Sequence, residues 1–302
     1  MNKELRELFD KNNIITKKIT IKNNVRIIDS GKDRLVIKRR DKDLDEIYKY
    51  LKSRSFDFFP EIIYRTDNYD VYKHIEDANI SKEEKAEDII KLTTILHSKT
   101  TFYKDIDDDT YKELYENILE RLEYLMNYYS DMVEIIESEV YMSPSHYFFI
   151  RKVSKVFASL DYCKYHIDKW YQLIEEKKRI RVVQLHNNLS LEHYLIEDNR
   201  PYLISWRKST RDIPIYDLIN LYKKYYNDLD FFELLRKYEI NYPMLPEEKE
   251  LFFVLISIPE KLDFRDTEYN MCKKVQKFYD YLLNSEKLII DYLPKEEMKR
   301  VS

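Results

Sequence analysis

The chain has 302 residues, and 52 Lys and Arg residues against 56 Asp and Glu residues give it a formal net charge of −4. That length and a hydrophobic share of 44% are enough to bury a sizeable core, and they exclude a disordered chain. The near-neutral charge argues against a nucleic-acid partner, and no run approaches the ~18 apolar residues of a membrane span. We therefore expect a folded protein with neither nucleic acid nor membrane as its partner.

Glycine is almost absent, because Gly31 is the only one in the chain. Phosphate-binding loops of the GxGxxG and GxxxxGKS/T kinds need several glycines, so Rossmann dinucleotide enzymes and P-loop NTPases are excluded. The two cysteines, Cys163 and Cys272, have no CxxC partner and cannot form a disulfide framework. Together with a charged N-terminus that lacks a signal-peptide core, they predict a cytoplasmic protein.

The first 78 residues are rich in β-branched runs. Strands are predicted at 19–21, 25–28, 35–38, 62–64 and 69–72, with a helix at about 44–51 between the third and the fourth strand. The single glycine falls in the turn at 29–33, where a positive φ is most useful. We expect residues 1–78 to form a small antiparallel β-rich lobe.

From Ser81 onward the pattern is mostly helical. Ser81 and Glu84 form a capping box, and apolar residues at helical spacing continue through three long helices to about residue 177. A β-hairpin at 194–196 and 202–204 follows, and helical spacing resumes at Leu218. Residues 79–302 are therefore predicted to be a large, mostly helical lobe with a polar loop at 185–207, which makes the chain a two-lobed α+β protein.

The segment from Val182 to Lys208 carries a recognisable pattern. Leu185-His186-Asn187-Asn188 is followed by His193, and later by Ile204-Ser205-Trp206-Arg207. This resembles the catalytic loop and metal-binding strand of the aminoglycoside phosphotransferase and choline kinase superfamily, where L-H-G-D-x-x-x-x-N leads into D-x-D. Within that superfamily the chain looks most like the CotS-type spore-coat kinase-like proteins. The resemblance implies a protein kinase-like fold with a small antiparallel β N-lobe and a large helical C-lobe.

Four further positions fit the same template. Lys38 resembles the strand lysine that contacts nucleotide phosphates, and Glu46 resembles the helix glutamate that pairs with it. By the same resemblance His186 has an architectural role in the catalytic loop, and Asp217 braces that loop through backbone hydrogen bonds. Lys38 and Glu46 would then mark a vestigial nucleotide site. The alternative for Lys38 is an ordinary solvated lysine, because it adjoins Arg39 and Arg40.

The departures from the pattern fall on the residues that carry the chemistry. The catalytic base of the family is a carboxylate, but Asn188 has an amide that cannot act as a base near neutral pH. The metal-binding positions are His193 and Ser205, which are poor Mg²⁺ ligands. Arg207 replaces the second acid of D-x-D and reverses the charge there. No catalytic or metal site is therefore expected to be intact.

These losses predict a pseudokinase that acts as a scaffold or a spore-coat-associated binding protein, in the cytoplasm or on the spore. We expect a protein partner, such as a spore-coat component, and no cofactor except ATP bound weakly without Mg²⁺. One alternative is an atypical phosphotransferase that uses Glu192 or Asp198. Another is a regulator that holds a nucleotide or another small molecule between the lobes. The basic residues Arg207, Lys208 and Arg211 could bind an anion or simply face solvent.

Overall fold

The computed structural model describes residues 3–22, 25–31, 33–40, 44–78, 80–105, 108–175 and 177–292. The chain divides into two compact units. The first consists of Met1–Thr100 and His186–Thr210, and the second of Thr101–Leu185 and Arg211–Ser302. The loop segment after residue 185 thus groups with the N-terminal residues, while the predicted division into 1–78 and 79–302 stays a prediction.

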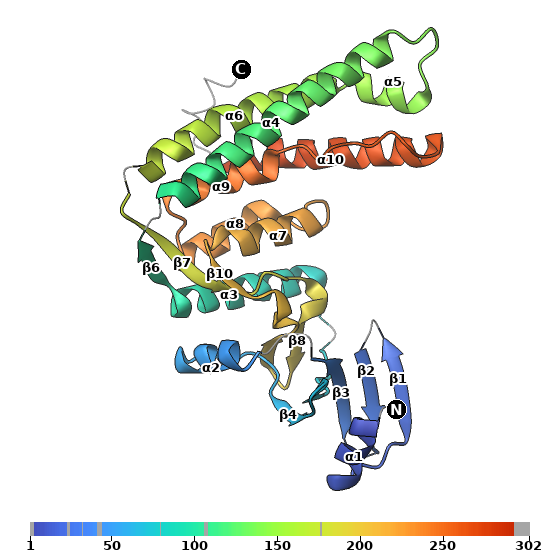
Figure 1. Cartoon of the computed structure of the whole chain (residues 1–302), viewed down its shortest axis with the longest axis vertical. Helices are drawn as coiled ribbons and strands as arrows, with labels where there is room; N and C mark the ends of the chain where they lie inside the picture. The colour runs from blue at the N-terminus through green and yellow to red at the C-terminus, as the bar shows by residue number, and fades with distance from the viewer. Residues whose placement is uncertain are drawn as a thin grey trace. The chain divides into compact units, whose positions relative to one another are not determined.

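An antiparallel sheet of five strands, in the order β1-β2-β3-β5-β4, forms the centre of the first unit (Figure 1). Its strands are β1 Lys18–Lys22, β2 Val25–Asp29, β3 Arg34–Arg39, β4 Ile62–Arg65 and β5 Tyr69–Lys73. The β-branched runs in the sequence predicted all five strands. The single glycine also takes the predicted conformation, because Gly31 has a φ of 82° in the turn between β2 and β3.

One face of this sheet is covered by a helix that the sequence did not predict, α1 Lys3–Lys11. Leu5 and Phe9 lie four residues apart on one side of α1, and both are buried with Leu35, Ile37 and Val71 of the sheet in a single hydrophobic cluster. The other positions of α1 are mostly charged, which conceals its short apolar face in the sequence. The opposite face of the sheet is left for Lys38 and its neighbours.

The rest of the first unit contains the other elements that surround the candidate site described below. Its elements are α2 Asp45–Ser53, α3 Lys82–Thr100, η1 Leu191–His193, β8 Tyr194–Glu197, β9 Arg200–Leu203 and η2 Trp206–Lys208. Strands β8 and β9 form the predicted hairpin, with Tyr194 opposite Leu203. The backbone amide of Leu203 donates to the carbonyl of Phe58, which ties the hairpin to the segment after α2.

Residues other than glycine occupy most of the left-handed backbone positions in the described part of the chain. The described residues with positive φ other than Gly31 are Asn13, Ser55, Asn187, Asp198, Asn199 and Ser205. Asn and Asp enter this region at the lowest cost among residues with a side chain, because their short polar groups hydrogen-bond locally. Asn187, with a φ of 57°, occupies the glycine position of the L-H-G-D pattern. The loop conformation is therefore available without glycine.

Helices make up most of the second unit (Figure 1). They are α4 Asp108–Glu137, α5 Pro144–Ile150, α6 Val153–Glu175, α7 Ile215–Tyr225, α8 Phe231–Asn241, α9 Pro246–Ser257 and α10 Glu268–Tyr292. Helix α6 packs against α4 and α9 and buries Cys163 and Trp170. Among the helices the structure describes, none combines the length and apolar character needed to cross a bilayer.

A small sheet with strand order β10-β7-β6 accompanies these helices. It consists of β6 Phe102–Asp105, β7 Arg179–Leu185 and β10 Thr210–Asp212. The sequence predicted none of the three strands. In β7 the residues from Ile180 to Leu185 are all buried, so the strand lacks the one-sided alternation that marks a half-exposed strand. The predicted α+β class, with a small antiparallel β lobe and a large helical lobe, is confirmed.

Candidate functional site

Strand alternation places Lys38 on the sheet face opposite α1. Leu35 and Ile37 of β3 point into the cluster under α1, so Lys38 points the other way. Its partners in the antiparallel register are Asp70, directly opposite, and Tyr72 two residues further along the same face. The Lys38 ammonium lies 5.8 Å from the centre of the Tyr72 ring.

The carboxylate nearest to Lys38 in the register is already engaged. Asp70 is buried and accepts a hydrogen bond of 2.7 Å from Nε of Arg65 on β4, and Arg65 also pairs with Asp45. Among the residues described, Lys38 has no carboxylate within ion-pair distance. Glu46 is exposed in the first turn of α2 and is not brought to Lys38. The nucleotide-site roles of Lys38 and Glu46 therefore stay predictions.

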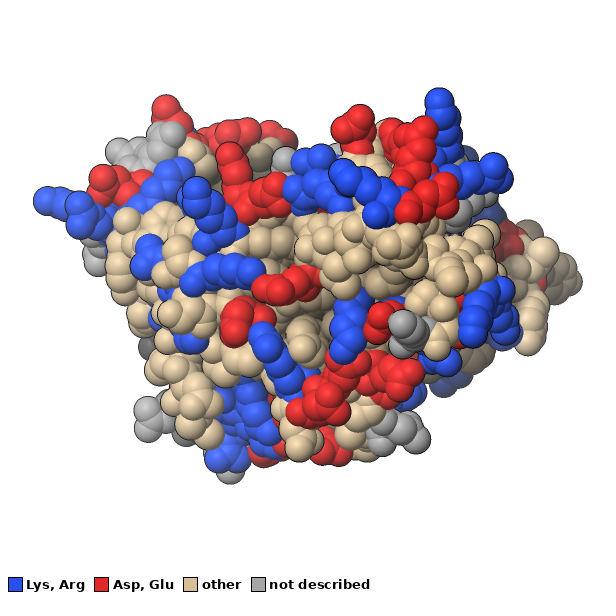
Figure 2. Space-filling view, turned by 90° about the horizontal axis from the view of Figure 1, so that it is seen from below, with Lys and Arg blue, Asp and Glu red and all other residues tan. Residues whose placement is uncertain are grey.

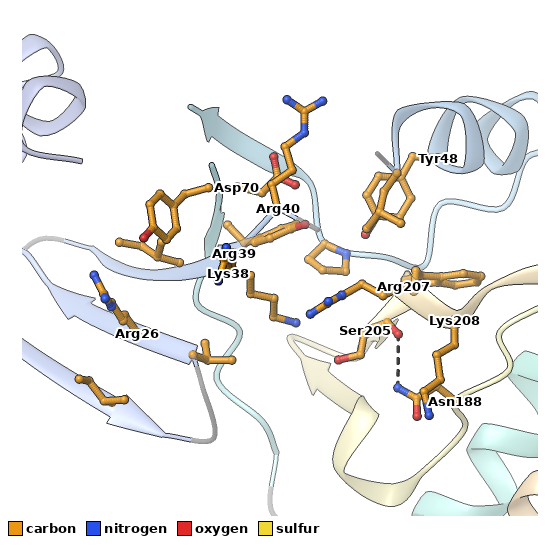
Figure 3. Close-up of a pocket in the computed structure, with 18 residues that line it drawn as sticks. Arg26, Lys38, Arg39, Arg40, Tyr48, Asp70, Asn188, Ser205, Arg207 and Lys208 are labelled. Atoms are coloured by element: carbon orange, nitrogen blue, oxygen red, sulfur yellow. Dashed lines mark hydrogen bonds between the residues drawn. The ribbon is translucent and has the colours of Figure 1, made fainter. Parts of the chain in front are cut away.

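The loop after β7 presents an amide where the family pattern has its base. Nδ2 of Asn188 donates a long hydrogen bond of 3.5 Å to the backbone carbonyl of Ser205, as the dashed line in Figure 3 shows. Ser205 has left-handed backbone angles, with φ 72° and ψ 47°, at the start of η2. An amide that donates to a carbonyl and a neutral hydroxyl beside it offer neither a base nor a charged metal ligand.

Two histidines hold the loop through backbone carbonyls. Nε2 of His186 lies 2.9 Å from the carbonyl oxygen of Ile204, and Nδ1 of His193 lies 2.7 Å from that of Asn188. Because a carbonyl can only accept, both ring nitrogens carry hydrogen and donate. A nitrogen that donates in this way is not a metal ligand. His186 is fully buried, and its architectural role in the loop remains a prediction from the resemblance.

Trp206 anchors the short helix η2 and so sets the position of Arg207. Its side chain is fully buried, its ring packs edge-on against Phe56, Phe59 and His186, and its indole N–H donates to the carbonyl of Leu203 at 2.8 Å. With Trp206 inside, the next residue of the turn projects outward. In Figure 3 the Arg207 guanidinium and the Lys38 ammonium point toward one another.

These side chains line a cavity of about 940 Å³ that lies within the first unit. Among its described lining residues the basic ones are Arg26, Lys38, Arg39, Arg40, Arg207 and Lys208, and the acidic one is Asp70. The outer surface is different, because Figure 2 shows Lys and Arg interspersed with Asp and Glu over the face it presents. Among the described lining residues, basic side chains thus outnumber acidic ones, in a chain whose net charge is −4.

Burial and nearby charges shift the pKa values of two side chains that line the cavity, Lys38 and Tyr72. Burial lowers the pKa of Lys38 below the usual lysine value, and the positive charge of Arg207 lowers it further. Burial likewise raises the pKa of Tyr72 to about 12, helped by the nearby charge of Asp70. Tyr72 is therefore a neutral phenol near pH 7, and the Lys38 ammonium lies in an environment that penalises its charge.

Several other residues singled out in the sequence lie away from the cavity. Glu192 in η1 and Asp198 in the β8–β9 turn are exposed, and neither is among the described lining residues. Arg211 is part of β10 and contacts Gln184. Asp217 is fully buried in the first turn of α7, and its role in bracing the loop stays a prediction.

Sequence reasoning did not identify three residues of the site near Lys38, which are Tyr48, Arg65 and Tyr72. Tyr48 of α2 and Tyr72 of β5 hydrogen-bond one another and line the cavity, and Arg65 fixes Asp70. The alternation Asp70–Tyr72 in the sequence is a signal for a shared face. Which strand faces Lys38 depends on the sheet order, and β5 lies beside β3 although β4 comes first in the chain.

Comparison with solved structures identifies the fold. The chain is similar to an aminoglycoside phosphotransferase from Alicyclobacillus acidocaldarius, with a TM-score of 0.69 and 11% identity over 95% of this chain and 93% of that one. It is also similar to the AMP-bound complex of a spectinomycin phosphotransferase, with a TM-score of 0.53 and 13% identity over 95% and 94% of the two chains. No protein-family model and no curated protein sequence matches it. The predicted kinase-like fold is confirmed.

Proposed function

We propose that this protein is a pseudokinase of the aminoglycoside phosphotransferase and choline kinase superfamily, which acts by binding and does not transfer phosphoryl groups. The observation that carries the proposal is Asn188, whose amide donates to the Ser205 carbonyl at the position of the catalytic base. A general base contributes roughly 10²–10⁴-fold to a rate, and an amide contributes none of this.

The metal-binding positions support the same proposal. Ser205 supplies a neutral hydroxyl, and His193 supplies an imidazole nitrogen, which is a poor ligand for Mg²⁺. Arg207 adds a positive charge that repels a divalent cation. In phosphoryl transfer the metal ions bridge the phosphates and neutralise the developing charge, which is worth several kcal/mol. A site without base and metal ligands has lost both main sources of catalysis.

A second candidate function is a regulator that holds a small molecule. The cavity of about 940 Å³ favours it, because ligand sites are typically concave and roughly 300–1,000 Å³ in volume. ATP without Mg²⁺ is a candidate ligand. The atypical phosphotransferase has no comparable support, since Glu192 and Asp198 are exposed and absent from the described lining.

A protein partner, and spore-coat association in particular, rests on the resemblance to CotS-type proteins. We infer a role as a scaffold or coat-associated binding protein, with the cytoplasm or the spore as its location. This inference is separable from the loss of catalysis, because a pseudokinase can bind a small molecule, a protein or both.

The test is a phosphoryl-transfer and ATP-hydrolysis assay with Mg²⁺, using spectinomycin and choline as acceptors. We expect the turnover of the natural protein to equal that of Asn188→Ala, since neither has a base. Turnover at ~1–100 s⁻¹, the range of active kinases, that is lost in Lys38→Ala would contradict the proposal.

A charge-restoring variant provides the matched control. It combines Asn188→Asp, His193→Asn, Ser205→Asp and Arg207→Asp, and so rebuilds the family pattern. The left-handed backbone of Ser205 accepts aspartate, because Asp and Asn are enriched in that region. Gain of Mg²⁺-dependent ATP hydrolysis in this variant alone would show that the assay detects a working site on this scaffold.

A further inference from the structure

We propose that two copies of this chain associate through residues 134–152 of the helical unit, which we call the α5 surface. These residues comprise the last turn of α4, the connection to α5, α5 itself and the step into α6, and all belong to the second unit. Figure 1 shows α5 beside one end of the long helices α4 and α6. The inference goes beyond the proposed function and is independent of it, because it uses no residue of the cavity.

Large apolar side chains are exposed together on the α5 surface. They are Ile135, Val140, Tyr141, Met142, Tyr147 and Phe148. Tyr141 is 91% exposed and Val140 is 88% exposed, and no other described large apolar residue is as exposed as these two. Single exposed apolar residues are ordinary, but a group within one short segment indicates a surface that another molecule covers.

Buried contacts on the inner side hold this surface in place. The fully buried ring of Phe149 packs against Tyr129 and Tyr279, and the Tyr279 hydroxyl donates to the Phe149 carbonyl at 2.6 Å. At the start of α5 the backbone amide and the hydroxyl of Ser145 both donate to the Glu268 carboxylate, at 3.0 and 3.1 Å. Association costs less free energy when the binding side chains are already ordered. Helix α5 is therefore a preorganised platform for the apolar residues.

Charges of both signs border the apolar residues. Glu134 and Glu137 are exposed in the last turn of α4, and Arg151 and Lys152 are exposed after α5. The guanidinium carbon of Arg151 lies 5.4 Å from the centre of the Tyr147 ring, so its charge adjoins the apolar side chains. Within the described part of the chain, none of these four charged groups has an ion-pair partner.

The balance of these charges favours a second copy as the partner. Glu139, the remaining acid of the α5 surface, pairs internally with His146 at 2.8 Å. Two acidic and two basic side chains are left, and a partner of one sign would neutralise only half of them. A copy related by a twofold axis presents the same surface, so the acidic end of each α4 can face the basic residues after the other α5. The apolar side chains then meet between them, and buried tyrosines contribute strongly to such interfaces.

The first experiment is analytical ultracentrifugation of the full chain over a concentration series up to ~100 μM, where interfaces of modest size associate. We expect a reversible dimer. Tyr141→Glu and Val140→Glu should each weaken association about tenfold or more, because they place an unpaired charge in the apolar contact. The matched controls are Tyr165→Glu on α6 and Ile240→Glu on α8, which are exposed outside the α5 surface and should associate like the natural protein.

Thermal unfolding in dilute solution separates a lost interface from a lost fold. All four substituted residues are exposed, so each variant should melt at the temperature of the natural protein when the concentration is too low for association. Weaker association of the two α5-surface variants with unchanged melting is the expected combination.

Charge reversal tests whether the surface is complementary to itself. Glu134→Lys with Glu137→Lys makes all four charges positive, and Arg151→Glu with Lys152→Glu makes all four negative. Neither double variant should associate with itself, but a mixture of the two should form a heterodimer, since every facing pair is then opposite in sign. Adding Tyr141→Glu to the negative variant should abolish the heterodimer, which separates this interface from general attraction between oppositely charged proteins.

Three results would overturn the proposal. They are a species of one chain over the whole concentration series, equal association of Tyr141→Glu and Tyr165→Glu, and no heterodimer in the mixture. A single chain that bound vesicles of phosphatidylcholine and phosphatidylserine through Tyr141 would assign the surface to lipid and would also overturn it. Turnover in the transfer assay is a separate result, because it would contradict the loss of catalysis and leave the self-association unaffected.

Discussion

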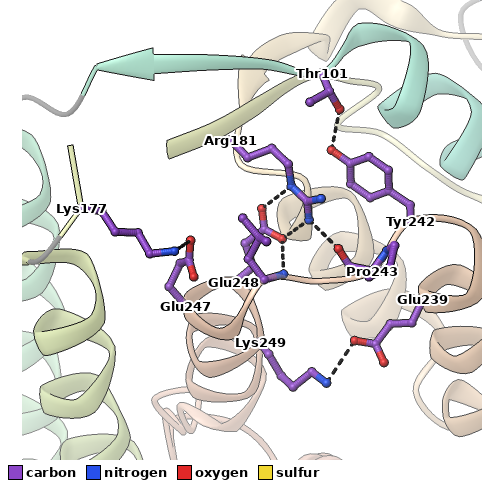
Figure 4. Close-up of polar contacts among 10 residues, drawn as sticks. Thr101, Lys177, Arg181, Glu239, Tyr242, Pro243, Glu247, Glu248 and Lys249 are labelled. Carbon is purple, nitrogen blue, oxygen red and sulfur yellow. Dashed lines mark hydrogen bonds and ion pairs between the residues drawn. The ribbon is translucent and has the colours of Figure 1, made fainter. Parts of the chain in front are cut away.

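Arg181→Met is expected to lower the free energy of unfolding by about 3–5 kcal/mol, because it leaves a buried carboxylate without its partner. Nε of Arg181 donates to Oε1 of Glu248 at 2.9 Å, and its Nη2 donates to the other carboxylate oxygen and, at 2.8 Å, to the carbonyl of Pro243 (Figure 4). The Tyr242 ring lies 4.2 Å from the guanidinium carbon. The side chains of Arg181 and Glu248 are 9% and 3% exposed, so water cannot replace these contacts.

A second variant separates the buried charge from lost packing. Glu248 also accepts from the backbone amide of Leu245 at the start of α9, and glutamine can keep that contact. Adding Glu248→Gln to Arg181→Met removes the unpaired charge, so the double variant should recover part of the loss. Urea unfolding, monitored by circular dichroism, gives the free energy of unfolding of the natural protein, of Arg181→Met and of the double variant.

The same strand provides the control for Arg181. Arg179 of β7 pairs with Asp105 of β6 at 2.7 Å, but these side chains are 66% and 80% exposed. Arg179→Met should therefore change the free energy of unfolding by less than about 1 kcal/mol, as exposed pairs do. Equal losses in Arg179→Met and Arg181→Met would refute the assignment of the large effect to burial.

Trp206→Ala is expected to cost about 3–5 kcal/mol, the range for removing a buried tryptophan. The indole packs against Phe56 and Phe59 and donates to the Leu203 carbonyl, so alanine leaves both a void and an unpaired acceptor. Unfolding in urea measures the loss.

Trp206→Phe is the matched variant, because it keeps an aromatic ring in the same place. It should cost clearly less than alanine. A cost below about 1 kcal/mol for Trp206→Ala would mean that the ring is not part of the core of the first unit.

The elements of the first unit could largely be read from the sequence, because β-branched runs between polar turns mark half-buried strands. Helix α1 was missed since charged residues surround Leu5 and Phe9. Strand β7 was missed because it is buried on both faces and because Arg181 lies within it, paired with a residue 67 positions away. Local patterns do not reveal a partner that is brought close only by the fold.

In the candidate site, too, some residues could be identified from the sequence and some contacts could not. Asn188, Ser205 and Arg207 were identified because they lie within one short motif whose spacing is set by the chain itself. The ion pair between Arg65 and Asp70 depends on the order of the strands in the sheet. The proximity of Arg207 to Lys38 depends on the burial of Trp206. The sequence left open whether Arg207, Lys208 and Arg211 bind an anion or face solvent. In the structure Arg207 and Lys208 line the cavity, and Arg211 is part of β10.

The most direct test of the account is one calorimetric comparison, in which ATP is titrated into the natural protein in EDTA and again in excess Mg²⁺. The account predicts that Mg²⁺ brings no gain in affinity, because Asn188, His193 and Ser205 supply no carboxylate to hold a metal ion. Binding that appears only with Mg²⁺ would contradict it, because it would mean that the site still holds a metal ion and that catalysis has to be considered again.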